Sequence, residues 1–190
     1  SRLTPSDLRQ AALAESLFTP GAVVLKYWET DRTLVGGAMP TQGELVLPVP
    51  QQLAAATFNE RRELGIINLG GPGSVRVDGE VHPLGPVDCL YVGRGARQVV
   101  FGSSQPSQPA RFYLLSYPAH MTYPTRRMAF QEVKGVELGD PAQANARTIY
   151  KFIHAEGIAS CQLVMGVTTL KVGSVWNTMP PHTHLRRSEV

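Results

Sequence analysis

The sequence predicts an all-β protein that contains a jelly-roll barrel and the start of a second one. Seven or eight short runs rich in β-branched and aromatic residues lie between about residues 22 and 118, separated by Gly, Pro and Asp. Asp78-Gly79, between two alternating runs, is a strong signal for a two-residue hairpin. Strand-like runs return after residue 147. A jelly roll takes about eight strands, so the first set is sufficient for one barrel.

A short helix is predicted at the start of the chain. Thr4 suits the N-cap, Pro5 suits the first helical position, and Asp7 stands where a capping box needs an acid. We expect this helix to cover residues 5–17 of an N-terminal helical segment, residues 1–20.

The first β-domain is expected over residues 21–119, without a metal site. Its predicted strands are VVLKYW, TLVGGAM, ELVLPV, LGIINLGG, SVRVDGEVHPL, CLYVG, RQVVF and RFYLLSY. Within it, Glu60 and Glu63 alternate with arginines in FNERRELG. This alternation predicts an ion-pair network at a surface or an interface.

Residues 120–146 show no periodicity and are interpreted as a linker or a strap over a sheet. Strand character returns over residues 147–190, in RTIYKFI, CQLVMGVTTL and SVWNTM. Only about 40 residues remain for this second β-domain, so its barrel is expected to be incomplete in the given chain.

Composition limits the classes of partner. The net charge of +3 comes from 18 basic and 15 acidic residues with no long run of one sign, so no nucleic-acid arm is indicated. No apolar run approaches the roughly 18 residues of a membrane span, and no signal peptide is evident. A cytoplasmic protein is expected, although the start at Ser1 leaves a removed leader open. Cys89 and Cys161 lie in apolar, strand-like contexts and are predicted to be buried thiols.

The stretch MPPHTHLRRSEV contains the candidate metal ligands. His182 and His184 are two residues apart and would share one face of a strand. Glu189 has the wrong parity for that face, so a turn or bulge within residues 185–188 is required for it to join them. Imidazole and carboxylate suit zinc, iron or manganese alike, and the alternative is a polar strand end.

Several stretches resemble the family of 5-keto-4-deoxyuronate isomerases, also called 4-deoxy-L-threo-5-hexosulose-uronate ketol-isomerases. They are NERRELGIINLGGPGSVRVDG, YVGRGARQVVF, PAHMTYPT, LGD and CQLVMGVTTLKVGSVWNTMPPHTHLRRSEV. The resemblance extends from about Thr33 to Val190. It implies a bicupin with one Zn²⁺ per subunit in the second cupin and a bacterial, hexameric enzyme. By the same resemblance His182, His184 and Glu189 are the first three zinc ligands, and a fourth, a histidine, is expected beyond Val190.

The implied reaction is an aldose–ketose isomerisation. It interconverts 5-keto-4-deoxyuronate and 3-deoxy-D-glycero-2,5-hexodiulosonate in the breakdown of pectin or another polyuronate. Arg186 and Arg187, beside the ligands, are candidates to bind the substrate carboxylate, and His120 is a third substrate-binding candidate. The catalytic base is not identified. The alternatives are a non-catalytic cupin that binds a sugar acid, an iron-dependent oxygenase, and an inactive fragment of the isomerase.

Overall fold

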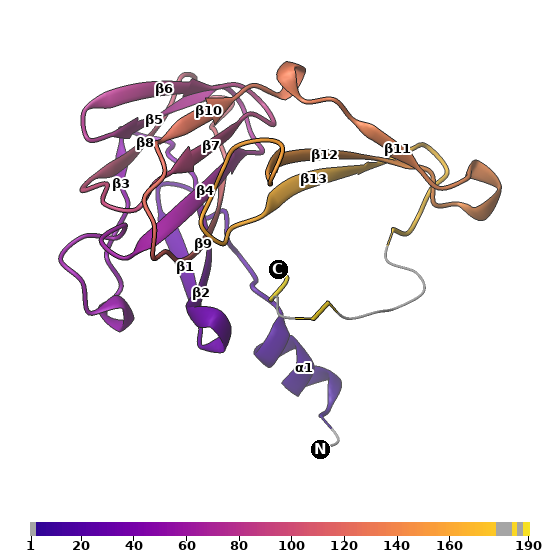
Figure 1. Ribbon diagram of the computed structural model, residues 1–190, viewed down its shortest axis with the longest axis horizontal. Helices are drawn as coiled ribbons and strands as arrows, with labels where there is room; N and C mark the ends of the chain where they lie inside the picture. Colours follow the sequence, from indigo (N-terminus) through magenta and orange to yellow (C-terminus); the bar gives the residue numbers. More distant parts are fainter. Residues whose placement is uncertain (1–2, 178–183, 186–187) are drawn as a thin grey trace.

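The computed structural model describes residues 3–177, 184–185 and 188–190. Two antiparallel sheets face each other, and a third sheet extends away from them (Figure 1). Helices are few and short, so the all-β class predicted from the sequence is confirmed.

The largest sheet has six strands in the order β1-β2-β9-β4-β7-β10. In that order its strands are β1 (Val23–Trp28), β2 (Thr33–Ala38), β9 (Phe112–Pro118), β4 (Arg62–Asn68), β7 (Cys89–Val92) and β10 (Arg126–Met128). The opposing sheet consists of β3 (Leu45–Val46), β8 (Val99–Ser103), β5 (Gly73–Val77) and β6 (Glu80–Leu84). Strands β2 to β9 therefore form two four-stranded halves, β2-β9-β4-β7 and β3-β8-β5-β6, which is the arrangement of a jelly roll.

Each predicted run overlaps an observed strand of the first barrel, since the signals in the sequence are local. The run SVRVDGEVHPL overlaps two strands, β5 and β6, and only Leu45–Val46 of ELVLPV is in a strand. Side chains alternate in and out along β5, whose Val75 and Val77 are buried in the barrel core. At the end of β5, Asp78 and Gly79 both have positive φ, 49° and 94°. This is the conformation that a tight hairpin turn between twisted strands requires, and β6 pairs with β5 directly after it.

Strands β9, β4 and β7 have both faces buried, which gives the molecule two apolar cores. On β4, Leu64 and Ile66 point into the barrel, whereas Ile67 points out into a second core. The second core adds residues from the other two strands and from the chain after residue 150, among them Cys89, Tyr91, Leu115, Phe152, Ile158, Leu163 and Met165. The outer face of the large sheet is thus the inner face of a second packing layer.

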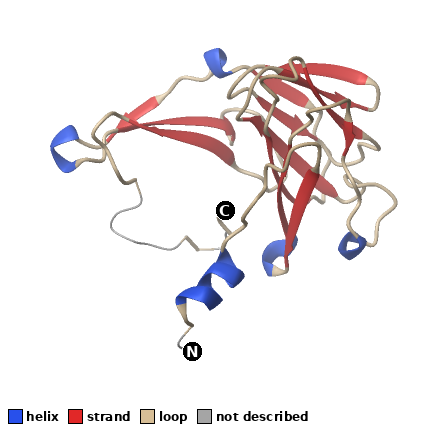
Figure 2. Cartoon of the chain, turned by 180° about the vertical axis from the view of Figure 1, so that it is seen from behind, coloured by secondary structure: helices blue, strands red, loops and turns tan. Residues whose placement is uncertain are grey.

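The third sheet covers that outer face and leads toward the candidate ligands. It consists of β11 (Val136–Leu138), β12 (Arg147–Ile153) and β13 (Met165–Leu170), and its β12–β13 hairpin extends beyond the barrel (Figures 1 and 2). The prediction for β12 is confirmed. The strand predicted from CQLVMGVTTL is too long at its start, since residues 161–164 are not in a strand, and residues 174–177 of SVWNTM form none either.

The segment between the barrel and β12 is fixed by Asp88 rather than loose. It contains β10, which pairs with β7, and the short helix η3 (Phe130–Glu132). Asp88 accepts hydrogen bonds from the N–H of Phe130 at 2.9 Å, the guanidinium of Arg127 at 2.6 Å and the N–H of Gly85 at 2.9 Å. Burial by itself raises the pKa of Asp88, but these three donors outweigh it and leave the pKa below its ordinary value.

The N-terminal helix is shorter than predicted. Helix α1 covers Pro5–Ala12, with the predicted capping box formed between Thr4 and Asp7, and Leu13 is already extended. A side chain at Gly37 of β2 would collide with the carbonyl oxygen of Leu17 and the ring of Phe18. Residues 17–18 therefore pack directly on the sheet, and this tertiary contact replaces the last helical turn of the prediction.

Three further 3₁₀ turns complete the described elements: η1 (Thr30–Arg32), η2 (Gln51–Leu53) and η4 (Pro141–Gln143). In the part of the chain that the structure describes, no helix is long and apolar enough to cross a lipid bilayer.

Gly65 of β4 lies against the second layer with no room for a side chain. A Cβ there would lie 2.6 Å from Met165 Sδ and 2.7 Å from Leu163 Cδ2. We expect Gly65→Ala to lower the free energy of unfolding by about 1–3 kcal/mol, because the added methyl overpacks the second core. Gly102→Ala, where the nearest atom lies at 3.6 Å, is the matched control in β8 and should be close to neutral. Denaturant unfolding measures both, and equal effects would contradict the expected tight packing.

Asp88→Asn should change how stability depends on pH. The pKa of Asp88 is lower in the folded protein than in the unfolded chain, where it is about 3.9. The ionised carboxylate therefore stabilises the fold at pH values above about 3.9, and this stabilisation is lost as the pH falls through the folded-state pKa. The melting temperature of the wild type should exceed that of the variant at neutral pH, and the gap should narrow below about pH 4. Arg127→Gln, which removes one of the three donors, should give a smaller gap at neutral pH. A gap that stays constant down to strongly acidic pH would contradict this role.

Candidate functional site

Two of the three predicted metal ligands lie in contact. The Nδ1 atom of His184 contacts the Oε1 atom of Glu189. Leu185, directly after His184, lies in a turn, and such a departure from regular strand geometry is what the spacing of the two residues requires. An imidazole nitrogen and a carboxylate oxygen from residues five positions apart are thus in direct contact.

The third predicted ligand, His182, and the two candidate arginines, Arg186 and Arg187, lie outside the described residues. Among the described residues, no three His, Cys, Asp or Glu side chains come together as a metal-binding group. The pair that is described still fits a divalent metal, since nitrogen and carboxylate oxygen donors suit zinc, iron and manganese. His184 and Glu189 are 47% and 64% exposed, which leaves the pair open to a ligand.

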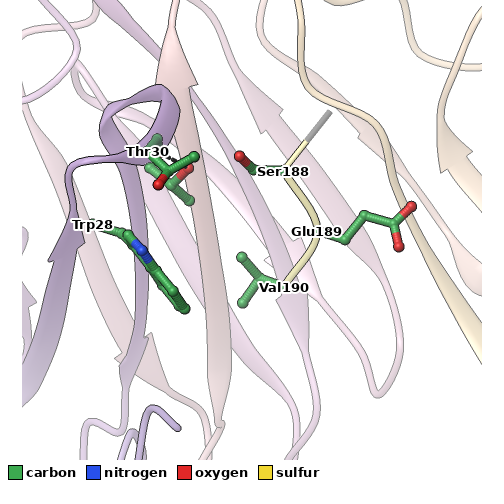
Figure 3. A pocket seen from close by; sticks show the side chains of 6 residues that line it. Trp28, Thr30, Ser188, Glu189 and Val190 are labelled. Carbon is green, nitrogen blue, oxygen red and sulfur yellow. Dashed lines mark hydrogen bonds between the residues drawn. The ribbon is translucent and has the colours of Figure 1, made fainter. Parts of the chain in front are cut away.

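The residues around Glu189 rest on the first barrel. Ser188 and Val190 face Trp28 and Thr30 across a cavity of about 170 Å³, and the Glu189 carboxylate points away from it (Figure 3). The Tyr117 hydroxyl donates to the Ser188 carbonyl oxygen at 3.2 Å. The Ser188 hydroxyl in turn donates to the carboxylate of Asp31 in η1. Two elements of the barrel, β9 and η1, therefore position the backbone that carries Glu189.

Glu63 is buried, contrary to the prediction of a surface or interface ion-pair network. It has no exposed surface, and both of its carboxylate oxygens accept hydrogen bonds. Oε1 accepts from the N–H groups of Gln162 at 2.6 Å and Leu163 at 2.7 Å. Oε2 accepts from the N–H of Cys161 at 2.8 Å and from the Tyr91 hydroxyl at 2.7 Å. We call this arrangement of one carboxylate and three successive backbone amides the Glu63 clamp.

The Glu63 clamp explains why β13 starts at Met165, later than the sequence predicted. The N–H groups of residues 161–163 bond to Glu63, so they are not available to a β-ladder. Tyr91, whose hydroxyl donates the fourth hydrogen bond to Glu63, is shielded from water. Burial is the main cause that raises the pKa of Tyr91, and the hydrogen bond to Glu63 is the second. The clamp thus connects β4 and β7 of the barrel to the loop that precedes β13.

The neighbouring charged residues Glu60 and Arg62 differ in burial. Glu60 is partly exposed and lies 3.7 Å from the guanidinium of Arg61, as the predicted surface network requires. Arg62 is buried and bonds to the hydroxyl and carbonyl of Ser116 and to the carbonyl of Arg32. Burial lowers the pKa of Arg62 to about 10, so it stays charged at neutral pH.

His120, a substrate-binding candidate from the sequence, contacts the second layer, and its partner there is a thiol. The Sγ atom of Cys161 lies 3.2 Å from Nδ1 of His120. His120 is exposed and Cys161 is half-buried, so the prediction of a buried thiol is wrong for Cys161. It is confirmed for Cys89, which has no exposed surface. Cys161 is exposed in part because the clamp holds its backbone in a loop at the edge of the second core.

Sequence reasoning missed the Glu63 clamp, although a signal for it exists. Leu64 and Ile66 alternate with Gly65 and Ile67, so RELGIIN is apolar on both faces. A strand of this kind is buried on both sides. Glu63 shares its face with Gly65 and Ile67, which places its carboxylate at a buried interface rather than at a surface.

A double-sheet jelly roll with an exposed imidazole–carboxylate pair beside it is a protein of the cupin type. The sequence family is more specific. The chain belongs to the KduI/IolB family, whose model matches residues 17–190.

Curated relatives match along the whole chain. A protein of Opitutus terrae called 4-deoxy-L-threo-5-hexosulose-uronate ketol-isomerase is 52% identical over 100% of this chain and 69% of its own length. A protein of the same name from Halalkalibacterium halodurans is 51% identical over 100% of this chain and 68% of its own length. Among solved structures, an IolB-like protein from Salmonella typhimurium LT2 has a TM-score of 0.52 at 15% identity, over 67% of this chain and 47% of its own. That likeness concerns the fold.

Glu63→Gln should destabilise the protein by about 2–4 kcal/mol. The substitution replaces one carboxylate oxygen by an NH₂ group, which cannot accept a hydrogen bond, so buried backbone N–H groups lose their acceptor. Glu60→Gln is the control, since it changes a partly exposed acid three residues away and should stay within about 0.5 kcal/mol of the wild type. Chemical denaturation measures both, and amide hydrogen exchange should accelerate at residues 161–163 in Glu63→Gln alone. Equal stability of the two variants would contradict the clamp.

Proposed function

We propose that this chain carries the ketol-isomerase activity named for its relatives. The reaction interconverts 5-keto-4-deoxyuronate and 3-deoxy-D-glycero-2,5-hexodiulosonate, which makes the protein an intramolecular oxidoreductase of the aldose–ketose type. The observation that carries the proposal is identity of 52% and 51% to two proteins of that name across the whole chain. Family membership over residues 17–190 supports it.

The proposed site uses one Zn²⁺ per subunit, held by His182, His184 and Glu189, with the histidine expected beyond Val190 as the fourth ligand. Support comes from the contact between His184 and Glu189, which places two suitable donor atoms side by side. When bound, the metal supplies Lewis-acid polarisation of the substrate carbonyl.

The chain's own groups would bind and orient the substrate. Aldose–ketose exchange moves a proton between two neighbouring carbons, so the substrate must be held with both of its oxygens near the ligands. Arg186 and Arg187, beside the ligands in sequence, are proposed to bind the substrate carboxylate through a two-pronged guanidinium contact. His120 was a third candidate for this role, and its contact with Cys161 favours the different role described below.

We also propose the source of the substrate, the oligomeric state and the cellular compartment of the enzyme. The substrate would come from pectin or another polyuronate, and the subunits would assemble as a hexamer in the bacterial cytoplasm. The absence of any long run of one charge sign in the sequence supports a small-molecule partner in place of nucleic acid, and no membrane partner is proposed.

Glu189→Gln should reduce isomerase turnover and metal content together, since the substitution replaces a carboxylate ligand by a weaker amide. We expect kcat/KM to fall by about 100-fold or more, and bound zinc, measured by elemental analysis, to fall below one ion per subunit. Glu156→Gln, in the exposed turn after β12, is the matched control and should keep both values. Zinc lost without loss of turnover would contradict the proposed site.

The same assay separates the alternatives. Binding of the uronate without turnover by the wild type would identify a sugar-acid-binding cupin. Bound iron with oxygen consumption would identify an oxygenase. Either result would overturn the isomerase proposal.

A further inference from the structure

The thiol–imidazole contact between Cys161 and His120 involves neither His184 nor Glu189 and plays no part in the proposed isomerisation. The sulfur lies 3.2 Å from Nδ1 and 3.7 Å from Nε2 of the ring. A sulfur this close to both nitrogens lies against the face of the ring, and a turn of the exposed ring about its Cβ–Cγ bond would direct a nitrogen at the thiol so that it can take the proton. A thiolate is the reactive form of cysteine, and a neighbouring histidine favours it.

The two residues are held near each other by separate parts of the fold. His120 follows the end of β9, where Pro118 pairs with Arg62 and the N–H of Ala119 donates to the Arg61 carbonyl at 2.9 Å. Cys161 is held by the Glu63 clamp. The side chain of Gln162 adds a hydrogen bond to the Pro118 carbonyl at 3.2 Å, which joins the two backbones directly. The two side chains are therefore held within reach of each other, although they are 41 residues apart.

The groups that face Cys161 leave the imidazole as its proton acceptor. The carboxylate of Glu63 is close, but both of its oxygens already accept hydrogen bonds from backbone amides. The Tyr91 hydroxyl, also close, donates to Glu63. The ring of His120 is exposed, so a proton that it takes from the thiol can pass on to solvent.

The two thiols of the chain contrast strongly. Cys89 has no exposed surface, and burial, followed by the nearby charge of Asp88, raises its pKa well above the ordinary range. Cys161 is half-buried at the edge of the second core and borders an exposed histidine. One thiol is thus shielded from solvent and reagents, and the other is open to small molecules.

We propose that Cys161 and His120 form a reactive thiol site that is modified reversibly by small disulfides, the oxidised forms of low-molecular-mass thiols. His120 takes the proton of Cys161, and the sulfur attacks one sulfur of the disulfide R–S–S–R. The S–S bond of the reagent breaks as the new bond to Cys161 forms, and R–S⁻ leaves with the electron pair and takes up a proton. The products are a mixed disulfide at Cys161 and one free thiol R–SH, and excess thiol reverses the reaction.

The test is the reaction of the native protein with a chromogenic aromatic disulfide. In the wild type one thiol should react rapidly, and peptide mass spectrometry should place the adduct on Cys161. His120→Asn should slow this reaction about five- to tenfold at neutral pH and move its pH profile toward alkaline values. His154→Asn is the control, because its ring accepts a hydrogen bond from the N–H of Glu156 instead, and it should react as the wild type does. Cys161→Ser should abolish the rapid phase.

Two outcomes would overturn the proposal: an adduct on Cys89, or equal rates for His120→Asn and the wild type across the pH range. A fold defect in the variant is recognisable, because it would expose Cys89 and make two thiols reactive. In denaturing guanidinium chloride the wild type and His120→Asn should react at the same rate, since the effect of the ring depends on the folded geometry. A difference that persisted there would also contradict the proposal. Turnover of the uronate does not enter this test, so its result is independent of the proposed isomerase function.

Discussion

The fully buried carboxylate of Glu63 is the interaction on which the relation between the two layers depends. A charged group in an apolar core is costly unless hydrogen bonds replace its lost water, and here three backbone amides and a hydroxyl do so. Because those amides belong to three successive residues, the carboxylate fixes the path of the chain and not only a distance. The same loop determines where β13 starts and where Cys161 lies relative to His120.

The first barrel could be predicted from the sequence because its signals are local. Alternation along β5 and the Asp78-Gly79 turn act over a few residues and do not depend on distant parts of the chain. The errors occur where a distant contact decides. The helix stops at Ala12 because residues 17–18 pack on β2, and the residues before β13 leave the strand because Glu63 takes their amides.

In the candidate site, too, the features that depend on local sequence could be predicted and those that depend on distant residues could not. The spacing of His184 and Glu189 contains enough information to require a turn, and the structure has one at Leu185. Glu60 and Glu63, by contrast, stand in nearly identical local sequence, each beside arginines, yet one is partly exposed and the other is buried. Glu60 lies in the bend before β4, whereas Glu63 is in β4 on the face that meets the second layer. The burial of that face depends on residues about 100 positions further along the chain, a range that local patterns do not cover.

The sequence separation within the Glu63 clamp has a consequence for how the chain folds. The bonded partners lie 98 to 100 residues after Glu63, so closing this loop is entropically costly and cannot be an early step. During synthesis from the N-terminus, β4, β7 and β9 can complete the barrel while residues 161–163 are still missing. The outer face of the sheet is then temporarily uncovered and apolar, but a hydrated carboxylate lies within it. That charge discourages association with other nascent chains until the later loop displaces its water.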